Sequence, residues 1–130
     1  MKTRAFFISL FLVISFCSYS QAKKVTPAGK WVGRLICKTK DTCKNRKVTV
    51  FVSKKTEPNV YQLVIYNGAD TTVAPYLTFE VLYDEPFQKA ITFFPNANEQ
   101  WDFYVNPAEM FGDYTRNRKL YYSVELKRSK

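Results

Sequence analysis

The sequence predicts an all-β protein, a single antiparallel β-barrel or barrel-like sandwich of seven to eight strands. Apolar and polar residues alternate with a period of two through most of the chain. β-branched and aromatic residues dominate these runs. Prolines cut the chain into pieces of strand length, at Pro58, Pro75, Pro86, Pro95 and Pro107. Since no piece carries the apolar stripe of an amphipathic helix, we expect at most one short helical turn, near residues 107–112.

The first 22 residues have the pattern of a secretory signal peptide. Lys2 and Arg4 precede an apolar run that ends at Cys17, and Ser20-Gln21-Ala22 fits a small-x-small cleavage site. We therefore expect an exported protein, secreted or periplasmic, with a signal peptide over 1–22, a flexible leader over 23–28 and one barrel domain over 29–130. Lipid attachment at Cys17 is an alternative, which the bulky residue before that cysteine disfavours.

The strands follow in order along the domain. The alternation predicts seven of them, at residues 31–38, 47–53, 60–66, 76–83, 87–93, 101–105 and 120–127. Asn67-Gly68 is a strong turn signal between the third and the fourth run. Residues 71–74 could add an eighth strand. In the segment that starts at Asn106, the asparagine could cap a helical turn that Gly112 would end.

Charge is divided along the chain. Residues 23–55 carry eleven basic side chains against one acidic, residues 56–113 one basic against nine acidic, and residues 114–130 six basic against one acidic. In a closed antiparallel meander the first and last strands are neighbours. The two basic segments are therefore expected to merge on one side of the molecule, opposite an acidic side.

Cys37 and Cys43 are the two cysteines of the expected domain. In an exported protein they predict a disulfide that closes a tight loop and stabilises the fold by about 2 kcal/mol. The sequence has no histidine and no second cysteine pair, so we expect no metal site and no cofactor.

Catalysis finds little support in the composition. Without histidine the usual general base near neutral pH is missing, and no serine or cysteine nucleophile has a partner to activate it. Two carboxylate pairs, Asp84 with Glu85 and Glu99 with Asp102, are more typical of solvated turns than of a glycosidase cleft. We therefore expect a protein that is not an enzyme.

A basic surface is the main candidate site. We expect the disulfide to hold a set of cations in place, at little entropic cost on binding. The last strand should bring further cations to the same side, and together they would attract arrays of phosphate, sulfate or carboxylate. The predicted anion-binding residues are Lys38, Lys40, Lys44, Arg46, Lys47, Arg116, Arg118 and Lys119. A basic surface without a dedicated partner is the alternative, and nucleic acid is unlikely to be the partner of an exported protein.

Bulky aromatic residues occupy the faces that we expect to be internal. They form the core or line a ligand pocket: Trp31, Tyr61, Phe79, Phe93, Trp101, Phe103 and Tyr122, with Phe87 added on the same pattern. A barrel of about eight strands is either filled by side chains or holds one small ligand. The size of these residues favours filling, while Tyr66, Tyr76, Tyr104 and Tyr121 fall on the opposite faces.

The segment Gly29-Lys30-Trp31-Val32-Gly33-Arg34-Leu35 resembles the Gly-x-Trp first strand of lipocalin-like (calycin) barrels. With Cys37 and Cys43 after it, the segment also resembles the N-terminal barrel of copper-homeostasis outer-membrane lipoproteins. In the pattern of those lipoproteins two residues separate the cysteines, whereas five separate them here. Avidin begins similarly. The lipocalin resemblance implies that Trp31 packs at the barrel floor against an arginine near the last strand, here Arg116 or Arg118. It covers about fifteen residues and implies no ligand.

These observations together predict an exported binding protein whose disulfide-pinned basic face engages an acidic partner, which could be a protein, an anionic glycan or a lipid surface. A carrier of a small apolar ligand in the barrel interior is one alternative. An inhibitor of a secreted enzyme, using the acidic segment, is another. The sequence does not specify the oligomeric state.

Overall fold

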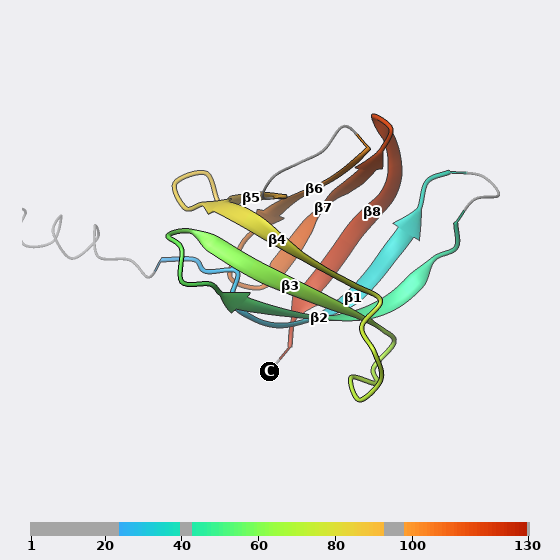
Figure 1. Cartoon of the computed structure of the whole chain (residues 1–130), viewed down its shortest axis with the longest axis horizontal. Coiled ribbons are helices and arrows are strands. Elements are labelled where there is room, and N and C mark those ends of the chain that lie inside the picture. The colour runs from blue at the N-terminus through green and yellow to red at the C-terminus, as the bar shows by residue number, and fades with distance from the viewer. Residues whose placement is uncertain (1–23, 40–42, 93–97, 130) are drawn as a thin grey trace, which may run out of the picture.

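The chain forms a closed barrel of eight antiparallel strands (Figure 1). The computed structural model describes residues 24–39, 43–92 and 98–129. The strands are β1 (Gly29–Cys37), β2 (Arg46–Lys54), β3 (Val60–Asn67), β4 (Leu77–Asp84), β5 (Lys89–Thr92), β6 (Glu99–Val105), β7 (Glu109–Arg116) and β8 (Lys119–Arg128). Each strand pairs with the next, and β8 pairs with β1 to close the barrel. The all-β prediction and the barrel are confirmed.

Side chains alternate between the inside and the outside of the wall, as the period-two pattern predicts. The inward residues form one buried core, built from large aliphatic and aromatic side chains: Trp31, Leu35, Val48, Val50, Val52, Tyr61, Leu63, Ile65, Val81, Tyr83, Trp101, Phe103, Val105, Met110, Tyr114, Tyr122, Val124 and Leu126. Because each of these is exposed by no more than 8%, the barrel interior is a packed core.

The eighth strand is β7, which the sequence pattern did not reveal. No helical turn forms at residues 107–112, and residues 71–74 form no strand. Asn106 acts as a turn cap instead, since its side-chain oxygen accepts hydrogen bonds from the backbone N–H groups of Ala108 (3.0 Å) and Glu109 (2.7 Å).

Gly112 interrupts the alternation of β7 for a steric reason. A Cβ atom at this position would collide with the backbone carbonyl of Asp102 on β6, and one at Gly33 would collide with that of Glu125 on β8. Strands approach so closely at these two points that only glycine fits, which allows the wall to bend as it closes. The residue that hid β7 in the sequence is therefore one that the barrel requires.

The β7–β8 pairing contains a register shift. Tyr114 lies opposite Tyr122, but Thr115 lies opposite Leu120, so β8 has one extra residue at Tyr121. Leu120 consequently leaves the inward face that the alternation gives it and is exposed. Phe87 also lies outside the predicted interior, 74% exposed, because it belongs to the turn between β4 and β5.

One end of the barrel, which we call the closed end, is covered by residues 24–28. This segment is the described part of the leader expected at residues 23–28, and it forms several hydrogen bonds with the barrel. The Trp31 ring N–H donates to the Pro27 carbonyl (2.9 Å), and the Tyr83 hydroxyl donates to the Val25 carbonyl (2.9 Å). Pro27 itself is buried. The segment thus acts as a lid on the core.

The arginine that packs on Trp31 is Arg128, not Arg116 or Arg118. Its guanidinium lies 4.2 Å from the centre of the Trp31 ring. Arg128 is the last residue of β8 and pairs with Trp31 in register, whereas Arg116 lies at the other end of the barrel. The expectation that an arginine packs on this tryptophan is therefore met by a different residue.

Candidate functional site

The two basic segments of the chain meet at the end of the barrel opposite the closed end, which we call the disulfide end. Cys37 lies opposite Tyr122 where β1 pairs with β8. Beyond the strand, the Lys38 N–H donates to the Tyr121 carbonyl (2.9 Å) and the Thr39 hydroxyl donates to the Leu120 carbonyl (3.2 Å). The loop after β1 and the start of β8 are therefore held side by side.

A disulfide joins Cys37 to Cys43, whose Cα atoms are 5.7 Å apart. A second clamp lies next to it, because the Asn45 side-chain oxygen accepts a hydrogen bond from the Cys37 N–H (2.8 Å). The two links fix both ends of the loop that carries Lys38 and Lys44, both exposed. The predicted disulfide is confirmed, and it is compatible with an oxidising compartment.

Arg46 is the first residue of β2 and has the inward alternation of that strand. Its guanidinium lies over the Tyr76 ring, 4.6 Å from the ring centre. It also donates to the Tyr122 hydroxyl (3.5 Å) and to the Asn67 side-chain oxygen (3.4 Å). A planar cation therefore sits in the mouth of the barrel, directly above the aromatic core.

Arg116, the last residue of β7, reaches the same end from the other side of β8. Its guanidinium lies 5.0 Å from the centre of the Tyr121 ring and forms an exposed ion pair with Glu99 (3.7 Å). An exposed pair of this kind is screened by water and leaves the arginine available to other anions. Arg116 is thus a member of the basic end and, within the described residues, the one cation there that forms an ion pair.

Arg118 and Lys119 complete this end. Asn117 and Arg118 form the turn between β7 and β8, both in the left-handed region at φ of 52° and 65°. The turn is fastened by a hydrogen bond from the Asn117 N–H to the Asn98 carbonyl (2.8 Å). Arg118 and Lys119 are both exposed at the tip of this hairpin.

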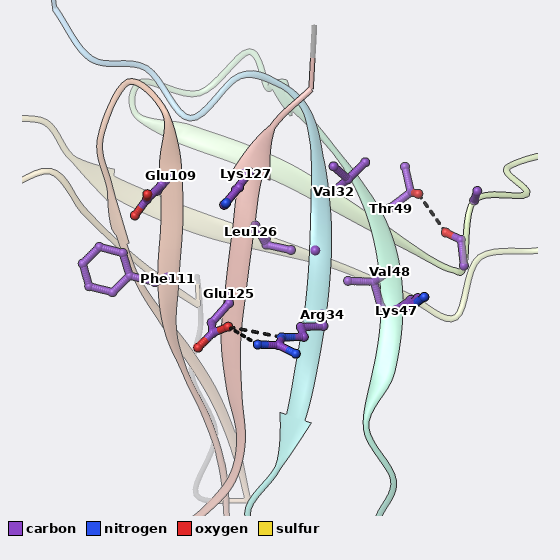
Figure 2. A pocket seen from close by; sticks show the side chains of 13 residues that line it. Val32, Arg34, Lys47, Val48, Thr49, Glu109, Phe111, Glu125, Leu126 and Lys127 are labelled. Carbon is purple, nitrogen blue, oxygen red and sulfur yellow. Dashed lines mark hydrogen bonds and ion pairs between the residues drawn. The ribbon is translucent and has the colours of Figure 1, made fainter.

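The structure thus brings six of the predicted anion-binding residues to one end, Lys38, Lys44, Arg46, Arg116, Arg118 and Lys119, which we call the basic rim. Lys47 is set apart, because it follows the inward-facing Arg46 and points to the outside of the wall (Figure 2). Lys40 was predicted to belong to the same site, and Phe93 to the core. Both lie outside the described residues, as do Cys17 and the signal peptide.

Tyrosines beneath the basic rim remain neutral near pH 7. Burial raises the pKa of both Tyr76 and Tyr114 above the ordinary tyrosine value. The hydrogen bond with Tyr122 raises the pKa of Arg46 further. Tyr76 and Tyr114 therefore add no negative charge beside the guanidinium groups at neutral pH.

Below the basic rim, the barrel is filled by stacked aromatic rings. The Trp101 ring stacks on Phe79 at 4.8 Å and on Tyr114 at 4.4 Å between centres, and Phe103 continues the stack. Trp31, Tyr61 and Tyr122 are buried in the same core, and Phe79 is partly buried against it. Apart from Phe87, the predicted core residues that the structure describes therefore belong to one packed core.

A groove of about 920 Å³ lies on the outer surface of the wall (Figure 2). Its floor is formed by β8 and β1, where Arg34 pairs with Glu125 (3.3 Å). Phe111 of β7 borders it on one side. On the other side Thr49 donates its hydroxyl to the Gly68 carbonyl (2.7 Å), which holds the loop after β3 against the wall. Sequence analysis missed this groove, because loop and strands meet only in the tertiary structure.

Of the two carboxylate pairs of the sequence, Glu99 and Asp102 point to opposite faces of β6. Asp84 and Glu85 lie where β4 ends, whereas Glu99 faces Arg116 and Asp102 pairs with Lys89 (3.6 Å) on the outer wall. Within residues 24–39, 43–92 and 98–129, no cluster of three cysteine or acidic residues could hold a metal ion. The same residues include no helix that could cross a bilayer.

Comparisons of this chain with protein-family models, with curated proteins and with solved structures found no match.

Proposed function

We propose that this protein is an exported, non-enzymatic binding protein, and that its basic rim engages an anionic partner. The observation that carries the proposal is the meeting of two distant basic segments at one end of the barrel, next to a disulfide. Of the six cations there, only Arg116 forms an ion pair within the described residues, with Glu99. A surface of this kind attracts arrays of carboxylate, sulfate or phosphate groups.

The rigidity of the rim supports binding of a partner with little loss of chain entropy. The disulfide and the Asn45 hydrogen bond join the two ends of the loop, and stacking on Tyr76 holds Arg46. Side chains that are ordered before binding lose less freedom when the partner arrives. We infer that the rim is a binding surface and not a basic surface without a dedicated partner.

A lipocalin-like relationship is the best interpretation of the barrel. Support comes from the eight-stranded meander, from the Gly-x-Trp start of β1, and from Arg128 stacked on Trp31 at the closed end. Carriage of a small apolar ligand inside the barrel, in contrast, receives no support, because stacked aromatic rings occupy the space that a ligand would need.

The proposal is tested by retention of the protein on heparin and on vesicles of anionic lipid over a range of salt concentrations. The double variant Lys38→Glu and Lys44→Glu should bind about tenfold more weakly at low salt. The control is Lys30→Glu with Lys54→Glu, which changes the charge equally away from the disulfide end. Retention on heparin alone would indicate a glycan, and retention on vesicles a membrane surface. Equal losses in the two double variants, or no retention at low salt, would contradict the proposal.

A further inference from the structure

Leu120 is an apolar residue that the fold places on the surface of the disulfide end. The alternation of β8 would turn it into the core with Tyr122, but the extra residue at Tyr121 shifts the register of the strand. Leu120 is 41% exposed as a result. Irregular pairing of this kind disrupts a sheet locally and re-aims side chains, frequently beside functional sites. The register shift therefore marks Leu120 as a contact residue to be explained.

Cations of the basic rim flank Leu120 on both sides. Lys119 and Arg118 precede it at the tip of the hairpin between β7 and β8. Arg116 pairs with Lys119 across that hairpin. On the other side of β8, the Lys38 N–H donates to the carbonyl of the residue that follows Leu120 (2.9 Å). An exposed leucine thus lies between two chain segments that carry four of the six cations of the basic rim.

The described carboxylates of the disulfide end do not offset these cations. In the loops and strand ends that the structure describes there, the carboxylates are those of Glu99 and Asp70. Glu99 pairs with Arg116, and Asp70 accepts hydrogen bonds from the N–H (2.9 Å) and the hydroxyl (2.6 Å) of Thr72. The residue opposite Leu120 on β7 is the uncharged Thr115. The surroundings of Leu120 are therefore apolar and cationic together.

Leu82 on β4 provides an internal comparison. It is also an exposed leucine, at 47%, but it lies on the outer wall towards the closed end. Its neighbours on the same face of β4 are Glu80 and Asp84, which are acidic. Exposure is therefore common to the two leucines, and of the two only Leu120 lies among cations.

We propose that the basic rim docks end-on to a bilayer of anionic lipid, and that Leu120 inserts at the boundary between headgroups and acyl chains. This inference rests on the proposed function of the basic rim and names its partner. Lysine and arginine side chains attract an anionic lipid surface, and an apolar side chain between them adds binding energy when it enters that boundary. A sulfated glycan presents similar negative charge but has no apolar layer that would accept a leucine.

The direction of approach is compatible with the positions of the chain ends. Residues 24–28 cover the closed end, and the Ser129 N–H donates to the Lys30 carbonyl (2.9 Å) near the same end (Figure 1). Neither end of the described chain therefore obstructs the basic rim.

Cosedimentation at low salt tests the proposal with two kinds of vesicle, phosphatidylcholine alone and phosphatidylcholine mixed with phosphatidylglycerol. The protein should bind the mixed vesicles and not the neutral ones. Leu120→Ser should weaken binding to the mixed vesicles about fivefold and leave elution from heparin unchanged, because it removes apolar surface and no charge. The matched control Leu82→Ser should change neither measurement, and thermal melting checks that both variants fold.

A second variant, Leu120→Trp, reports insertion directly. The native residues Trp31 and Trp101 are buried, so a change in fluorescence on binding comes mainly from the introduced indole. Its emission should move to shorter wavelength with the mixed vesicles and stay unchanged with heparin.

Three results would overturn the inference: equal binding to the two kinds of vesicle, equal vesicle binding by Leu120→Ser and Leu82→Ser, or no shift in emission. Retention on heparin without binding to vesicles would also overturn it, while the proposed function of the basic rim would stand. Loss of both kinds of binding in the native protein would contradict the rim proposal itself.

Discussion

Each end of the barrel carries an arginine stacked on an aromatic ring, and the two arginines are bonded differently. At the closed end Arg128 lies over Trp31 and donates to three backbone carbonyls, those of Pro107 (2.8 Å), Ala28 (2.7 Å) and Thr26 (2.7 Å). At the disulfide end Arg46 lies over Tyr76, and its two hydrogen bonds to protein groups are 3.4 and 3.5 Å long.

The difference separates a structural arginine from one that is available for binding. Arg128 uses its donors to tie the covering segment and the turn before β7 to the end of β8, so its removal would take away two of the hydrogen bonds that hold the lid. Arg46 is held in place by weaker contacts, and its remaining N–H groups can meet an anion at the barrel mouth. Burial and bonding, rather than residue type, decide the two roles.

The largest expected effect is that of Arg128→Ala. This variant loses three short charge-assisted hydrogen bonds and the contact with a buried tryptophan, and we expect unfolding to become easier by about 2–4 kcal/mol. Urea denaturation followed by tryptophan fluorescence measures it. Arg128→Lys should recover only part of the loss, because an ammonium cannot reach three carbonyls at once. A loss of unfolding free energy smaller than that of Arg46→Ala would contradict the assignment of Arg128 as the structural arginine.

Removal of the disulfide should have the next largest effect. With Cys37→Ser and Cys43→Ser together, we expect a loss of about 2 kcal/mol, because the unfolded chain gains the freedom of the short loop. The same variant should elute from heparin at lower salt, since Lys38 and Lys44 are less fixed. Denaturation of the native protein with and without a reductant provides the parallel measurement. Unchanged retention would show that the disulfide serves only stability.

For Arg46→Ala we expect a small change in stability and a clear change in binding. The lost hydrogen bonds are long and partly exposed, so unfolding should shift by no more than about 1 kcal/mol. Retention on an anionic support should fall while that of Arg128→Lys stays near the native value. A loss of stability as large as that of Arg128→Ala would show that the mouth arginine is structural too.

The smallest effect concerns the alkaline range. Burial raises the pKa of Tyr83, whose hydroxyl bonds to the covering segment at the closed end. The folded state then holds this proton more tightly than the unfolded state. The contribution of Tyr83 to stability is therefore constant below the ordinary tyrosine pKa of about 10 and falls as the pH rises above it. Tyr83→Phe should reduce this fall, although it loses the bond to Val25. Denaturation midpoints between neutral pH and pH values above 10 test it, and an unchanged slope would contradict it.

Much of the barrel could be predicted from local patterns. Alternation along β1, β2 and β3, and along β8 from Tyr122 onward, places the core residues correctly, because a strand with one buried face repeats every two residues. The meeting of the basic segments also followed from topology, since a closed meander makes the first and last strands neighbours. The disulfide followed from the spacing of two cysteines in a chain that has the pattern of an exported protein.

Other features were decided by close approach between strands. Gly112 interrupts the alternation of apolar and polar residues in β7, so the sequence did not predict this strand. The register shift at Tyr121 turned Leu120 outward. Each of these outcomes depends on which backbone lies opposite, and single-strand periodicity contains no such information.

By itself, the sequence determined the all-β class, the inward residues of most strands, the disulfide and the charge of each segment, because these depend on neighbours in the chain. Only the tertiary structure decided that Arg128 rather than Arg116 covers Trp31, that β7 is a strand, and that Leu120 lies on the surface among cations of the basic rim. Those facts depend on register between strands, which is set when the barrel closes and every backbone hydrogen bond has found its partner.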